Sequence, residues 1–148
     1  MADWLPLAER VAETLDIGSG TRVFEVDCGD GAFLYPLHQN GYIVGGIDGD
    51  PAAIERAIAA MPGGLFQVGM AAALDPAAPW DVVICRSLSG RADVDHMRGL
   101  VARMFAKATH AVALLNVPEK LHQPVLHALA EVGAKAIQIE GDHLFGRV

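Results

Sequence analysis

The stretch Val23–Asp50, VFEVDCGDGAFLYPLHQNGYIVGGIDGD, decides the fold. Its first apolar run, Val23–Val26, predicts a short buried strand, and the glycine-rich segment Cys28–Gly31 follows at once. Glycines let the backbone approach a ligand, and the N–H groups at the start of the next helix are free to bind it. Asp48 ends the next predicted strand, 19 residues after Gly29, where a carboxylate can accept hydrogen bonds from the ribose hydroxyls of a nucleoside. The stretch therefore predicts a βαβ unit that binds a nucleoside.

Two other nucleotide-binding motifs fit this loop poorly. The dinucleotide pattern G-x-G-x-x-G, counted from Gly29, places Leu34 at the third glycine, which normally permits close packing of helix and strand. No GK[ST] follows the glycines, which excludes a P-loop. The remaining alternative is a tight turn without a ligand, and the position of Asp48 favours the ligand.

The rest of the chain alternates between helical and strand periodicity. Helices are predicted over residues 3–16, 32–40, 51–61, 93–108 and 121–132, and strands over 23–26, 42–47, 65–68, 81–85 and 111–115. The tail predicts a hairpin of residues 136–140 and 143–148. Strands alternating with amphipathic helices indicate the α/β class and a doubly wound sheet covered on both faces. We expect the order α(βα)5, with five parallel strands, a C-terminal β-hairpin whose last strand is antiparallel, and a single domain over residues 1–148.

Composition narrows the range of partners and compartments. The 148 residues carry 11 Lys and Arg against 18 Asp and Glu, a net charge of −7, so a phosphate backbone is not an expected partner. No apolar run is long enough for a membrane span, and the N-terminus shows no signal pattern. The two cysteines form no metal-binding or redox spacing. We therefore expect a cytoplasmic protein without a membrane segment, a metal or a nucleic-acid partner.

Over nearly its whole length the chain resembles the class I, Rossmann-like S-adenosylmethionine-dependent methyltransferases. The family's first motif, an acidic residue followed by x-G-x-G-x-G, is similar to Glu25–Gly31. Its second motif, a strand that ends in Asp, is matched by Asp48, and its strand-four motif by Trp80–Cys85. The resemblance implies S-adenosylmethionine as cofactor, with the loop around its methionine part and Asp48 on its ribose. The cofactor-binding residues it implies are Glu25, Asp27, Cys28, Gly29, Gly31, Asp48, Gly49, Met70, Ala71 and Arg86.

Three positions depart from the family pattern. Asp27 replaces the first glycine, so its carboxylate either obstructs the cofactor or pairs with the methionine ammonium. Gly49 stands where a bulky residue usually covers the adenine. Met70 falls where the family often has an Asp that binds the adenine amino group, and its thioether can pack on the purine instead.

Methyl transfer needs mainly alignment, with a general base only where the acceptor loses a proton. The candidate bases are His96, His122 and His143, which follow predicted strands at the carboxyl edge of the sheet. Each is also explained as a histidine on the surface of an acidic protein.

The function expected from the resemblance is methyl transfer to O or N of a small-molecule acceptor, in small-molecule metabolism. Two alternatives stay open. One is a repurposed fold that binds a nucleoside or other ligand without methyl transfer, and the other is a non-catalytic partner of another protein. Because the chain has little sequence beyond the core, we expect an open acceptor site that a homodimer or a partner protein closes.

Overall fold

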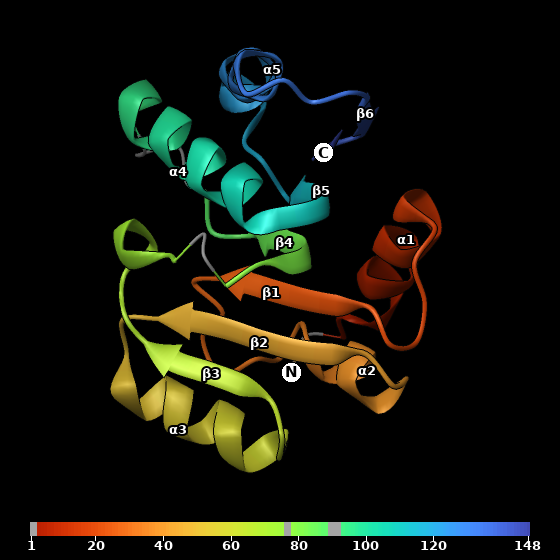
Figure 1. Cartoon of the computed structure of the whole chain (residues 1–148), viewed down its shortest axis with the longest axis vertical. Helices are drawn as coiled ribbons and strands as arrows, with labels where there is room; N and C mark the ends of the chain where they lie inside the picture. The colour runs from red at the N-terminus through yellow and green to blue at the C-terminus, as the bar shows by residue number, and fades with distance from the viewer. Residues whose placement is uncertain (1–2, 76–77, 89–92) are drawn as a thin grey trace.

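The computed structural model describes residues 3–75, 78–88 and 93–148. They form a seven-stranded sheet in the order β3-β2-β1-β4-β5-β7-β6 (Figure 1). The strands are β1 (Arg22–Val26), β2 (Ile43–Asp48), β3 (Leu65–Val68), β4 (Trp80–Cys85), β5 (Ala108–Leu114), β6 (Ile137–Glu140) and β7 (His143–Arg147). The helices are α1 (Leu5–Leu15), α2 (Tyr35–Gln39), α3 (Pro51–Ala60), α4 (Val94–Lys107) and α5 (His122–Glu131).

Strand pairing confirms the expected fold class. Neighbouring strands from β3 to β5 are parallel, whereas β7 pairs antiparallel with both β5 and β6. The last strand of the C-terminal hairpin thus lies between β5 and β6. The carboxyl ends of the parallel strands meet at one edge, which is where ligands bind in such sheets.

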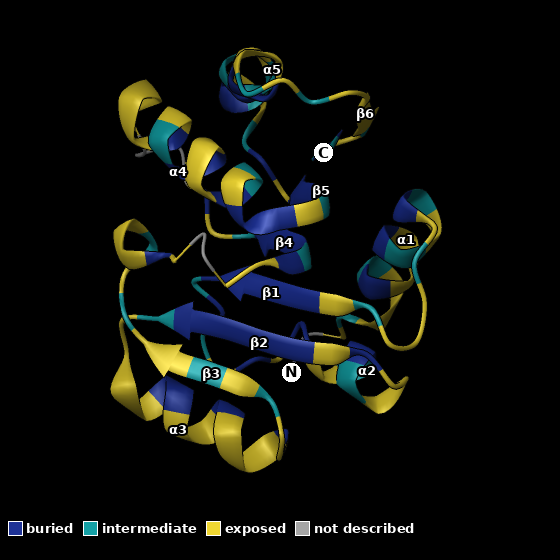
Figure 2. Ribbon diagram, in the orientation of Figure 1, coloured by how far each residue is buried: buried dark blue, intermediate teal, exposed yellow. Residues whose placement is uncertain are grey.

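Each face of the sheet packs against its own group of helices. Buried residues of α1, α2 and α3 join one apolar cluster with β1 residues such as Val23. Buried residues of α4 and α5 join a second cluster on the opposite face, with Phe24 and Val26. The alternation along β1 explains this, because successive side chains of a strand point to opposite faces. Its burial on both faces is visible in Figure 2.

The expected order α(βα)5 is wrong at one connection. Between β3 and β4 the chain forms only the short 3-10 turn η1 (Ala71–Ala73) and a loop. Three alanines supply too little apolar surface for a packed helix, and Pro79 directly precedes β4. Edge strand β3 consequently stays largely exposed, as Figure 2 shows.

The helix expected over residues 32–40 is shorter than the sequence pattern predicts. The segment that follows the glycine-rich loop turns first, and only Tyr35–Gln39 are helical. Among the described residues, no helix is both long and apolar enough to cross a membrane.

Candidate active site

The loop after β1 has three residues in the left-handed region of backbone conformation. Asp27 has φ 55°, Gly29 58° and Gly31 80°. A non-glycine residue is uncommon in this region, so Asp27 keeps the backbone path that a glycine would adopt freely. The Oδ2 atom of Asp27 also accepts a hydrogen bond of 2.7 Å from the hydroxyl of Ser87, just beyond β4. The departure from the family motif thus leaves the turn intact and links β1 to β4.

Asp48 at the end of β2 holds this loop in place. Its Oδ2 accepts a hydrogen bond of 2.8 Å from the backbone N–H of Gly29, and its Oδ1 one of 2.9 Å from that of Asp50. A carboxylate oxygen can accept two hydrogen bonds, so each oxygen retains acceptor capacity. Asp48 therefore shapes the loop and can still bind the hydroxyls of a ligand.

Met70 occupies the space next to Gly49. A Cβ atom added to Gly49 would lie 3.0 Å from the Sδ atom of Met70. Met70 itself is 65% exposed, and Ala71 follows it at the start of η1. The sequence predicts that Gly49 and Met70 both lie near the adenine. That Met70 fills the space beside Gly49 depends on how β2 and β3 align.

Glu25 and Arg86 form a buried ion pair where β1 and β4 lie side by side. The Nε atom of Arg86 donates to Oε2 of Glu25 over 2.5 Å. Glu25 is fully buried, and its Oε1 has no hydrogen-bond partner among the described residues. Burial raises the pKa of Glu25 to about 8, against the opposing effect of Arg86. Burial thus makes ionisation of this carboxyl unfavourable, and its Oε1 atom has no hydrogen-bond partner among the described residues.

Aromatic rings from the N-terminal segment and the glycine-rich turn surround Arg86. Its Cζ atom lies 4.5 Å from the ring centroid of Trp4 and 5.3 Å from that of Phe33. The two rings meet edge to face, 6.1 Å apart. Trp4 falls within the helix predicted over residues 3–16. Its helical spacing contained no signal of this contact, which depends on how α1 docks on the sheet.

Cys28 points into the core. Its backbone N–H donates to the carbonyl of Ile47, and a Cβ on Gly46 would lie 2.7 Å from its Sγ. Burial raises the pKa of the thiol to about 12, with Glu25 and Asp48 adding to the effect. The thiol therefore stays protonated and is no nucleophile. Any contact of Cys28 with a ligand is made by its backbone.

The three candidate histidines have different surroundings, and His122 and His143 contact the neighbouring residues Val117 and Asn116. His96 is exposed in the first turn of α4. The Nε2 atom of His122 donates to the carbonyl of Val117 over 2.9 Å and lies 3.3 Å from Oδ1 of Asp142. His143 accepts a hydrogen bond of 3.1 Å at Nδ1 from the backbone N–H of Asn116. Two of the three imidazoles therefore hold backbone groups. No cluster of metal-binding side chains occurs within the described residues.

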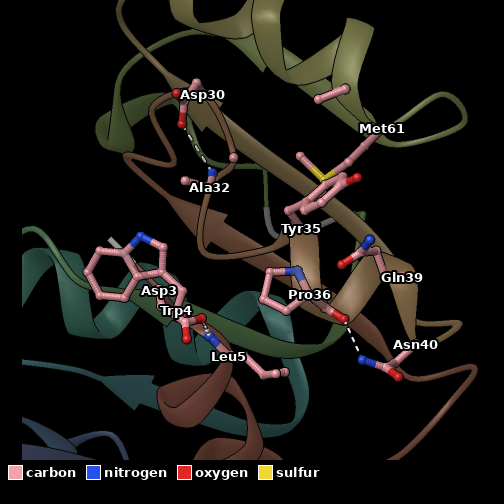
Figure 3. Close-up of a pocket in the computed structure, with 12 residues that line it drawn as sticks. Asp3, Trp4, Leu5, Asp30, Ala32, Tyr35, Pro36, Gln39, Asn40 and Met61 are labelled. Carbon is pink, nitrogen blue, oxygen red and sulfur yellow. Dashed lines mark hydrogen bonds between the residues drawn. The ribbon is translucent and has the colours of Figure 1, made fainter. Parts of the chain in front are cut away.

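A cavity of about 680 Å³ begins at the outer side of the loop and follows α2 (Figure 3). It is lined by Asp3, Trp4, Leu5, Asp30, Gly31, Ala32, Tyr35, Pro36, Gln39, Asn40, Ala60 and Met61. Asp48, Gly49 and Met70 are not among these residues. The cavity therefore shares Gly31 with the glycine-rich loop but does not include the residues expected at the ribose and the adenine.

This fold is that of the class I S-adenosylmethionine-dependent methyltransferases, as solved structures show. Magnesium protoporphyrin IX methyltransferase from Synechocystis PCC 6803, with bound S-adenosylmethionine, is 19% identical with a TM-score of 0.81, and the match covers 97% of this chain and 78% of that one. The sugar N-methyltransferase KedS8 from Streptoalloteichus is 15% identical with a TM-score of 0.79, over 98% and 87% of the two chains. CalS10, an amino pentose methyltransferase from Micromonospora echinaspora, is 25% identical with a TM-score of 0.66, over 76% and 50%.

Sequence comparison supplies a shorter match. A 23S rRNA (uracil-C5)-methyltransferase, RlmD of Nitrosococcus oceani, is 43% identical over 53 residues. The match covers 36% of this chain and 12% of the rRNA enzyme. No protein-family model matches the chain.

Proposed function

We propose that this protein is an S-adenosylmethionine-dependent methyltransferase that acts on O or N of a small-molecule acceptor. The observation that carries the proposal is the arrangement of the glycine-rich loop and Asp48 on a methyltransferase fold. The structural neighbours include enzymes with this cofactor bound, and their named substrates include a porphyrin and sugars. The net charge of −7 also favours a small molecule over a nucleic acid.

The residues present fit such a cofactor. A Cβ added to Gly29 would meet no atom within 4 Å, so the loop leaves open space on that side. In the proposal, the backbone of Cys28, Gly29 and Gly31 surrounds the methionine part and Asp48 accepts from the ribose hydroxyls. Gly49, Met70 and Ala71 lie next to the adenine, with the Met70 thioether in place of a side chain on Gly49.

In the proposal, charged side chains bind the carboxylate and the ammonium group of the methionine part of the cofactor. Arg86 donates to Glu25 through Nε, which leaves its terminal nitrogens to bind a carboxylate. Asp27 is the matching acceptor for an ammonium group, and Oε1 of Glu25 becomes a second acceptor when the ligand's positive charge draws the proton from that carboxyl. A buried acceptor without a partner costs about 1–3 kcal/mol, so a donor at Oε1 would stabilise the complex.

The cofactor supplies an already activated methyl group on its sulfonium. The protein then has to align the acceptor and exclude water. His122 and His143 use ring nitrogens to hold backbone groups, so we assign them to positioning. His96 is exposed, and its ring makes no hydrogen bond with any residue that the structure describes, so it is the candidate for proton transfer should the acceptor lose a proton.

Isothermal titration calorimetry with S-adenosylmethionine and S-adenosylhomocysteine tests the cofactor. Wild-type protein is expected to bind both. Asp48→Ala is expected to lose about 10- to 100-fold in affinity, the effect of losing a charged hydrogen bond of about 1.5–3 kcal/mol. Asp48→Asn removes the charge but keeps one acceptor oxygen for the two loop N–H groups, and Glu55→Gln on the surface of α3 is the control. No heat from either ligand with folded protein would refute the cofactor assignment.

The acceptor is tested by measuring S-adenosylhomocysteine formation with a library of small alcohols, phenols and amines, and in parallel with RNA fragments. Turnover with small molecules is expected. Turnover with RNA alone would contradict the small-molecule part and agree with the short match to an rRNA methyltransferase.

A second candidate function is ligand binding without methyl transfer. It is favoured by Asp27 in place of the motif's first glycine and by the Met70 side chain beside Gly49, two departures from the methyltransferase pattern. Mass spectrometry of the purified protein distinguishes the two. Retained S-adenosylmethionine or S-adenosylhomocysteine supports methyl transfer, and another retained nucleoside supports the second function.

A further inference from the structure

Another cavity, of about 320 Å³, lies at the carboxyl edge of the sheet beside β5 and β7. Its lining residues come from the start of α1, the segment after β5 and the first residue of β7. They are Asp3, Trp4, Pro6, Leu7, Arg10, Asn116 and His143. The volume falls at the lower end of the range for small-molecule sites. Three separate segments of the chain thus form a space for a small ligand.

This cavity is close to the proposed cofactor site. Trp4 lines it, and the ring of Trp4 lies 4.5 Å from the guanidinium carbon of Arg86. Arg86 in turn binds Glu25 at the end of β1. One side chain therefore separates the cavity from the ion pair beside the glycine-rich loop. A ligand here would lie next to the methionine part of the cofactor.

His143 lines this cavity and carries a hydrogen-bond donor on its ring. Asn116 has φ 53°, and its backbone N–H donates to Nδ1 of His143 over 3.1 Å. Because Nδ1 is the acceptor, the proton of the neutral ring is on Nε2. Burial lowers the pKa of His143, Arg10 lowers it further, and Asp142 and Glu140 oppose them. The imidazole is therefore a neutral N–H donor and not a general base at Nδ1.

Arg10 adds a cation to the same wall. Its guanidinium is exposed and has no ion pair or hydrogen bond with any residue that the structure describes. The carboxylate of Asp3 lines the cavity too, but it lies two helical turns earlier in the chain and accepts from the backbone N–H of Leu5. The lining thus offers Arg10 and His143 as donors together with the carboxylate of Asp3, while Asp142 and Glu140 act on His143 without lining the cavity.

We propose that this cavity binds a small organic acid, with its carboxylate on Arg10 and on the Nε2–H of His143. Guanidinium groups match carboxylates in geometry and charge, and a neutral imidazole adds a donor without a second positive charge. The proposal that this acid is the methyl acceptor rests on the proposed function. The proposal that the cavity binds such an acid does not depend on the proposed function.

The test compares acids with their uncharged amides. Benzoate, phenylacetate and 4-hydroxybenzoate, each with its primary amide, are titrated into the full chain without cofactor. Binding is followed by NMR through the ring nitrogens of His143 and the Nε of Arg10. The acids are expected to bind at least tenfold more tightly than the amides and to shift both signals. Arg10→Gln is expected to remove this preference, Arg10→Lys to restore part of it, and Arg56→Gln on α3 to leave it unchanged.

Two outcomes overturn the proposal: no acid of the series binds better than its amide, or Arg10→Gln keeps the wild-type preference. Calorimetry with S-adenosylmethionine on the same variants keeps the two proposals apart. An acid site without cofactor binding would leave this inference standing and refute the proposed function. Cofactor binding without a preference for acids would do the reverse.

Discussion

Replacing Glu25 by Gln is expected to change how the stability of the fold depends on pH. Gln keeps the shape of the side chain but cannot ionise. In the folded protein burial raises the pKa of Glu25 to about 8, above its ordinary value of 4.5. Between these values the folded protein holds a proton that the unfolded chain has released. The free energy of unfolding of the wild type therefore falls as the pH rises from about 4.5 towards 8.

The two pKa values set the size of the effect. Integrated from pH 5 to pH 8, the linkage amounts to about 3–4 kcal/mol of wild-type stability, which the Gln variant does not lose. The loss is a large part of the roughly 5–15 kcal/mol that stabilises a typical domain. Urea unfolding of both proteins at pH 5, 6, 7 and 8 measures it. The difference in unfolding free energy should move steadily in favour of the variant.

Glu55→Gln on the exposed surface of α3 is the matched control and removes a carboxylate of the same length. A difference between wild type and Glu25→Gln that stays constant with pH would refute the reasoning. In that case the Arg86 guanidinium would keep Glu25 ionised throughout, and the ion pair would outweigh the cost of burial.

Three further changes test the packing around the site and are measured by urea unfolding. Asp27→Gly should be more stable than Asp27→Ala by about 1 kcal/mol, because φ is 55° there; equal stability would contradict a strained turn. Gly46→Ala should lower the free energy of unfolding by about 1–3 kcal/mol, because the new Cβ would lie 2.7 Å from the Sγ of Cys28. Gly18→Ala, where a Cβ has open space, serves as control. Lys107→Met should lower the free energy of unfolding by about 1–3 kcal/mol, because the Nζ atom of Lys107 donates to two loop carbonyls at 2.8 and 2.7 Å. An unchanged stability would show that those carbonyls find other donors.

Local sequence patterns predicted most of the helices and strands. The buried strand before Cys28–Gly31 and the Asp at the end of the next strand both lie where the sequence predicts them. Asp50 caps α3 through a hydrogen bond of 3.0 Å to the N–H of Ala52, as its place before Pro51 indicates. Propensity and periodicity act over a few residues, so they predict such elements well. They also predict no helix between residues 68 and 81; only the expected order α(βα)5 implied one, and the structure has the short turn η1 there.

The sequence by itself determined the class of the fold, the glycine-rich loop and the position of Asp48, because these depend on short-range patterns. Only the tertiary structure decided which side chains meet. Trp4 reaches Arg86, Met70 fills the space beside Gly49, and His143 accepts from Asn116. Each contact joins residues on different helices, strands or loops, so it depends on the strand order and on how the helices pack on the sheet. For that reason the sequence did not indicate that two of the three candidate bases, His122 and His143, hold backbone groups through their rings.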